Sequence, residues 1–190
     1  ISNSFAADAI PVCPAYGRPL PINNEQILHW KRTTPNQFRE RGHIKGLLVR
    51  IYNDKSGHDH FSIQIGKDKA DSIEVIYNQD FGALPGQLTI GSTVEACGDF
   101  IVSTAPSGPY PASPDGAIIH WIHMNPSGKG HDPGFLVIDG TLYGQDAENA
   151  GPGGKYGKDW RDKNRPGKNN GNAGKNNWQR LNAEINQLSF

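Results

Sequence analysis

The sequence predicts a mainly β fold built around a small closed barrel, and three observations favour it. Hydrophobic residues make up only 35% of the 190 residues. The 23 Gly and 14 Pro interrupt the chain too often for long helices, which indicates short strands joined by turns. From residue 42 onward, apolar residues alternate with polar ones. Because a closed barrel buries only alternate, inward-facing positions, few apolar residues suffice for its core.

Five segments have the alternation and composition of strands, at residues 43–53, 60–67, 71–78, 93–104 and 117–125, and residues 134–144 add a short closing pair. In the fourth segment, the interior Gly98 predicts a bulge or a sharp bend. A bent first strand, a connector over residues 79–92 and a kinked fourth strand match a small five-stranded OB-like Greek-key barrel. Periodicity alone leaves another small β-barrel or a β-sandwich open.

Two segments precede the strands. Residues 1–22 are rich in proline and predict an extended leader. The OB-like barrel domain spans residues 23–144 and begins with a short helix, which Asn24 can cap and Pro35 must end or restart.

The two cysteines, Cys13 in the leader and Cys97 in the fourth predicted strand, lack the spacing of a tetrathiolate metal site. We predict a disulfide between them, with two unrelated thiols as the alternative. No window approaches 18 consecutive apolar residues, so the sequence predicts no membrane span. The chain starts without an initiator Met. We interpret it as a mature, secreted protein, periplasmic or extracellular.

The C-terminal part differs from the rest in composition and charge. Residues 1–150 carry 11 Lys and Arg against 16 Asp and Glu, a balance of −5, whereas residues 151–190 carry 8 against 3, a balance of +5. Residues 145–176, rich in Gly, Asn and Lys, predict a long basic tether without a core of its own. Residues 177–190 predict a short amphipathic helix, because apolar residues recur there at helical spacing: Trp178, Leu181, Ile185 and Leu188.

A histidine-rich motif carries a family resemblance. The chain from about residue 40 to residue 144 resembles a family of small, mostly exported, OB-like bacterial proteins that is catalogued only as a domain of unknown function. The matching positions are His120, Trp121, His123, Asn125, Pro126, Gly128, His131, Gly134 and Phe135, with His58, Phe61 and Asn78 earlier in the chain. One departure is an extra residue between Gly128 and His131. The resemblance implies the fold and export, and it implies no activity.

The sequence favours a non-catalytic binding module that contacts a polyanion, foremost nucleic acid such as DNA, without sequence specificity. OB barrels stack bases on aromatic rings and follow phosphates with Lys and Arg. The candidate stacking residues on the barrel are Tyr52, Tyr77, Tyr110 and Trp121. In the tail, the candidates are Lys155, Lys158, Trp160, Arg161, Lys163, Arg165, Lys168, Lys175 and Arg180, with Tyr156 among them. A solvated spacer is the alternative for this tail.

A second hypothesis is a self-assembling structural subunit of an extracellular filament or complex, with or without nucleic acid. The leader and the C-terminal helix are extensions with which a subunit can reach its neighbours. The basic tail would also attract the acidic body of another copy.

A third hypothesis is a metal-dependent hydrolase. The candidate ligands of a divalent metal are His58, His120, His123 and His131, with Asp59, Asp80 or Asp132 completing the shell. The alternative is a rigid hairpin in which prolines fix φ, glycines take positive φ and imidazoles donate to turn carbonyls. No nucleophile elbow, HExxH motif or Walker loop is present. The sequence therefore favours the hairpin, and it predicts no cofactor apart from that metal.

Overall fold

The structure is a computed structural model in which residues 9–53, 57–86 and 88–146 are described. All of them belong to one unit, Ile1–Gly151. The predicted tether from residue 147 on and the predicted helix at 177–190 lie outside the described residues. Within the described ranges, no helix is long and apolar enough to cross a membrane.

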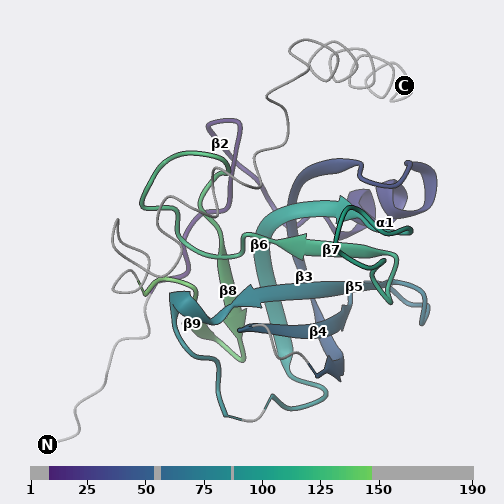
Figure 1. The fold of residues 1–190 in the computed structure, drawn as a ribbon. Helices are drawn as coiled ribbons and strands as arrows, with labels where there is room; N and C mark the ends of the chain where they lie inside the picture. The colour runs from purple at the N-terminus through teal and green to yellow at the C-terminus, as the bar shows by residue number, and fades with distance from the viewer. Residues whose placement is uncertain (1–8, 54–56, 87, 147–190) are drawn as a thin grey trace, which may run out of the picture. The chain divides into compact units, whose positions relative to one another are not determined.

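Five strands close into a barrel (Figure 1). They are β3 (Arg39–Tyr52), β4 (His58–Gln64), β5 (Ser72–Asn78), β6 (Thr93–Val102) and β7 (Ala117–His120). The order around the barrel is β3–β4–β5–β7–β6, and β6 pairs with β3 to complete it. β5 and β7 run parallel, and the other neighbouring pairs of barrel strands run antiparallel. This arrangement confirms the predicted OB-like Greek-key barrel.

The strand irregularities are only partly as predicted. β6 keeps an unbroken register with β3 through Gly98, so of the bulge or sharp bend expected there the bulge is absent. The predicted bent first strand, β3, carries a register shift between Leu48 and Arg50. A Cβ at Gly98 would overlap the backbone oxygen of His120 and the side chain of Ile122. Glycine is therefore required at this position because two strands approach closely.

The fifth strand is shorter than the predicted segment 117–125. β7 ends at His120 because Trp121 has a φ of 53°, in the left-handed region that side chains rarely adopt. The predicted closing pair is present as β8 (Phe135–Ile138) and β9 (Thr141–Tyr143). β8 pairs with the first half of β6, beside the place where β7 pairs with its second half.

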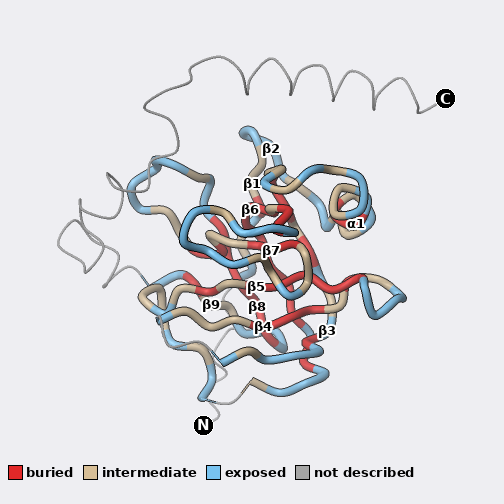
Figure 2. The backbone as a smooth tube through the Cα atoms, turned by 45° about the vertical axis from the view of Figure 1, so that its right-hand side comes forward, coloured by how far each residue is buried: buried red, intermediate tan, exposed pale blue. Residues whose placement is uncertain are grey.

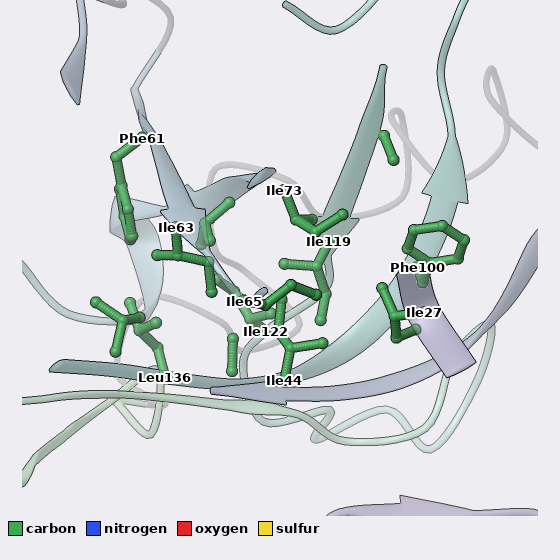
Figure 3. Packing of buried hydrophobic residues seen from close by; sticks show 14 of the residues in the cluster. Ile27, Ile44, Phe61, Ile63, Ile65, Ile73, Phe100, Ile119, Ile122 and Leu136 are labelled. Carbon is green, nitrogen blue, oxygen red and sulfur yellow. The ribbon is translucent and has the colours of Figure 1, made fainter. Parts of the chain in front are cut away.

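The barrel interior is one apolar cluster that draws on all five barrel strands. In Figure 2 the buried segments follow these strands, while the connecting loops are mostly exposed. Figure 3 shows side chains from distant parts of the chain meeting in this cluster, among them Ile44, Ile63, Phe100, Ile119 and Leu136. Burial of these alternate positions follows the period-two pattern that predicted the strands.

Helix α1 (Asn24–Thr33) adds Ile27 and Leu28 to the same cluster. Asn24 is the first helical residue and not the predicted cap. Its side-chain amide donates to the carbonyl of Lys45 at 2.7 Å and so ties the helix to β3. The helix ends two residues before Pro35, as expected.

The leader is less extended than predicted. It contains a small hairpin of β1 (Pro14–Ala15) and β2 (Arg18–Pro19). The predicted disulfide between Cys13 and Cys97 is confirmed, with the two Cα atoms 5.6 Å apart. Both cysteines join a second apolar cluster with Phe135 and Val137 of β8. The leader is thus attached to the outside of β6.

Candidate functional site

Histidines from two strands gather on the outer face of the barrel. His58 and His60 lie two residues apart on β4, and His120 ends β7, beyond the intervening β5. Their neighbours Phe61 and Ile119 point into the core, so the alternation of a strand directs the histidines outward. The ring centroids of His58 and His120 are 6.2 Å apart. The histidines therefore meet on the outer face and not across the barrel interior.

Four more rings extend this group into what we call the ring cluster: His58, His60, Phe81, His120, Trp121, His123 and His131. His123 stacks on Phe81 with centroids 3.6 Å apart and an angle of 13° between the planes. The centroid of Trp121 lies 4.5 Å from that of His120 and 5.7 Å from that of His131.

A charged network supports Trp121. The guanidinium of Arg39 lies 4.3 Å from the centroid of the indole, which is a cation–π contact. Arg39 also pairs with Asp99 through two hydrogen bonds. The other oxygen of Asp99 accepts a hydrogen bond of 2.8 Å from Arg41, whose side chain is buried. One carboxylate therefore fixes two guanidinium groups beside the ring cluster.

Burial lowers the pKa of three of the imidazoles. Desolvation lowers the pKa of His120 to about 3, and the nearby His58 adds to the effect. Desolvation also lowers the pKa of His123 to about 4, although the hydrogen bond to the carbonyl of Met124 opposes it. The pKa of His131 is lowered too, chiefly by burial.

The loop at 124–133 is held by its own hydrogen bonds. The side-chain amide of Asn125 donates to the carbonyls of Lys129 at 3.1 Å and His131 at 2.5 Å. Gly128 and Gly130 have φ values of 59° and 89°, in agreement with the predicted hairpin.

The imidazoles at the two ends of this loop are oriented in the same way. His123 Nδ1 lies 2.7 Å from the carbonyl oxygen of Met124, and His131 Nδ1 lies 2.8 Å from that of Asp132. A carbonyl oxygen can only accept, so each Nδ1 carries the proton. The imidazoles thus donate to turn carbonyls, as the hairpin hypothesis expects.

The predicted metal ligands form two pairs. His58 lies against His120, and His123 lies against His131. Among the residues that the structure describes, no three His, Cys, Asp or Glu side chains are arranged to hold a metal ion. Of the predicted carboxylates, Asp59 accepts a hydrogen bond from Gln79 at 3.0 Å. The four-histidine centre stays a prediction.

The loop between β6 and β7 is attached to the outer face of β4 and β5. Asp115 accepts hydrogen bonds from Ser62 and, at 2.8 Å, from Ser72. Ser113 donates to the buried Glu74 at 2.5 Å. In OB barrels this face and its flanking loops bind oligonucleotides. In this chain, a network of hydroxyls and carboxylates holds a loop on it.

The predicted stacking residues differ in how far a base could reach their rings. Tyr77 has no exposed surface, and its hydroxyl donates to the carbonyl of Gly82 at 2.7 Å, so we remove it from the interface. The hydroxyl of Tyr52 belongs to the Asp115 network. Tyr110 is 57% exposed. The predicted contact residues of the tail, eight basic residues and Trp160, lie outside the described residues: Lys155, Lys158, Trp160, Arg161, Lys163, Arg165, Lys168, Lys175 and Arg180.

Sequence reasoning missed Phe81, a member of the ring cluster, and the three charged residues beside the cluster, Arg39, Arg41 and Asp99. A signal was present for two of them, because Arg39 and Arg41 are two apart and share a face of a strand. Their partner Asp99 is 60 and 58 positions away in the chain. Only the pairing of β3 with β6 brings them together.

Comparison with known proteins adds no relatives to this picture. No protein-family model matches the chain, and a search of curated proteins finds no match. The family resemblance therefore stays a prediction.

Proposed function

We propose that this protein is an exported binding module that contacts a polyanion, foremost nucleic acid, without sequence specificity, and that residues 151–190 supply most of the contact. The division of charge carries the proposal, because a balance of +5 is concentrated in these 40 residues while residues 1–150 carry −5. Lys and Arg bind phosphates by charge, whatever the base. The barrel is then the folded body from which the basic segment reaches its ligand.

The barrel itself favours contact by charge over base stacking. Asp115 and Glu74 lie on the face that OB barrels use for oligonucleotides, where carboxylates repel phosphates. Trp121 is in contact with Arg39, His120 and His131, which leaves little of the indole for a base.

Export is the part of the proposal that the disulfide supports. A bond between Cys13 and Cys97 persists in oxidising compartments such as the periplasm or the cell exterior. Membership in the exported family that the chain resembles would agree with this location.

The test compares full-length variants in a salt series. Lys155, Lys158, Arg161 and Lys163 are replaced by Gln, and binding to a labelled single-stranded oligonucleotide and to heparin is followed by fluorescence anisotropy. The unsubstituted chain should lose affinity linearly with the logarithm of salt concentration, and the variant should show weaker binding and a smaller slope. The matched control carries Lys67→Gln and Lys69→Gln in an exposed turn of the barrel. The proposal is contradicted if the tail variant binds as tightly as the unsubstituted chain, or if the affinity does not change with salt concentration.

Self-assembly is a second candidate, favoured by apolar side chains that the leader exposes. Ile10 is 46% exposed, and Val12 is 66% exposed. A neighbouring copy would cover such surface, as in a filament subunit, with or without nucleic acid. If light scattering finds large species that the double substitution Ile10→Ser and Val12→Ser dissolves, assembly is supported. If the double variant forms species of the same size as the unsubstituted chain, the leader surface is not the assembly interface.

A further inference from the structure

The loop at 124–133 brings two imidazoles together at its base. His123 precedes the loop and His131 lies near its end, and the backbone N–H of Gly134 donates to the carbonyl of His123 at 2.7 Å. His123 is held further by the Phe81 ring stacked on it. Hydrogen bonds from Asn125 hold the backbone at His131. The two rings are therefore fixed relative to each other before any ligand arrives.

In both imidazoles, Nε2 is the nitrogen that is available to bind a metal ion. Each Nδ1 donates its proton to the carbonyl of the following residue, so Nε2 carries the lone pair in the neutral ring. Metal-binding histidines in proteins usually have this arrangement, because a hydrogen bond from the second nitrogen fixes the tautomer.

The separation of the rings fits a shared ion. A tetrahedral ion at about 2.0 Å from an imidazole nitrogen lies roughly 3.2 Å from the ring centroid, so two bound rings have centroids roughly 5.2 Å apart. The centroids of His123 and His131 are 5.2 Å apart, and the ring planes stand at 86°, so the rings are not stacked on each other.

We propose that His123 and His131 bind one divalent transition-metal ion through their Nε2 atoms. Zn²⁺, Co²⁺, Ni²⁺ and Cu²⁺ prefer imidazole, whereas Mg²⁺ and Ca²⁺ prefer oxygen ligands. Two protein ligands agree with the finding that no group of three ligating side chains exists among the described residues. Water completes the coordination. The site uses none of the basic residues of the proposed polyanion contact, so the two proposals fail or succeed separately.

The experiment is a titration of the full chain with ZnCl₂ by calorimetry and with CoCl₂ by visible absorbance. We expect one ion per chain, with affinity reduced tenfold or more by His131→Ala. The control is His29→Ala, which removes an exposed histidine of α1 and should leave the affinity unchanged. Equal affinity in the His131→Ala variant overturns the proposal, as does the absence of binding at millimolar metal.

A second measurement avoids substitution of the buried His123, whose loss could prevent folding. In ¹⁵N spectra of the histidine side chains, Zn²⁺ should shift the Nε2 resonances of two imidazoles, and Mg²⁺ should shift none. Assignment of the two to His123 and His131 supports the site. Shifts confined to other histidines overturn it.

Discussion

Trp121 is the residue at which the regular barrel ends and the ring cluster begins. A left-handed conformation at a non-glycine residue costs on the order of 1–3 kcal/mol, so surrounding contacts must maintain it. Here the indole contacts Arg39, His120 and His131. The turn at Trp121 also stops β7 and directs the chain into the loop that carries His131. A strained backbone thus positions several rings at once.

At the same scale, we expect acid to destabilise the fold through the histidines. Burial lowers the folded-state pKa to about 3 for His120 and about 4 for His123, below the ordinary value of 6.5. Between pH 6.5 and the lowered pKa of each histidine, the unfolded chain binds more protons than the folded chain. The free energy of unfolding therefore falls as the pH drops from about 6.5. Each histidine contributes a slope of at most about 1.4 kcal/mol per pH unit.

Urea denaturation at several pH values between about 7 and 5 measures this slope, because carboxylates contribute little in that window. His120→Gln should flatten the slope. A constant free energy of unfolding across the window would show that these imidazoles are not kept neutral by the fold.

At the scale of elements, the carboxylate of Asp115 is one of the two that attach the loop between β6 and β7 to the outer face of the barrel, with Glu74 as the other. Asp115 accepts hydrogen bonds from Ser62 and Ser72, and Tyr52 donates to it at 3.3 Å. Asp115→Ala removes the acceptor of Ser62 and Ser72, while Ser62 and Tyr52 can keep their hydrogen bond to each other at 2.8 Å. We therefore expect a loss of about 1–2 kcal/mol in the free energy of unfolding. Thermal or urea denaturation measures it, with Asp68→Ala as an exposed control. If both variants are equally stable, the loop does not depend on Asp115.

The strands were largely predictable because their signal is local. Alternation in residues 60–67 and 71–78 located β4 and β5 within a few residues. Two departures had non-local causes. Gly98, predicted as a bulge or a sharp bend, forms no bulge and is required by the close approach of His120. β7 ends at a backbone turn for which residues 117–125 contain no sequence signal.

For the whole molecule, the disulfide should contribute strongly to stability. It joins residues 84 positions apart, and closing a loop of that length is worth on the order of 4 kcal/mol in the chain-entropy model. The double variant Cys13→Ala and Cys97→Ala should lower the free energy of unfolding by about that amount. Reduction of the unsubstituted chain should cause a similar loss, which is the internal control. An unchanged midpoint of denaturation under reducing conditions contradicts this prediction.

The sequence by itself determined most of the strands and the turns around Gly128, because period-two burial and turn chemistry are visible along the chain. It favoured a closed barrel and a disulfide, but it left a β-sandwich and two unrelated thiols open until the strand pairing and the short distance between Cys13 and Cys97 decided. Only the tertiary structure decided which outward-facing residues meet. It joined Arg39 and Arg41 to Asp99 and placed His58 against His120. Alternation tells whether a side chain points inward or outward, but its partner on the outside depends on strand order and loop docking, which are long-range properties of the fold.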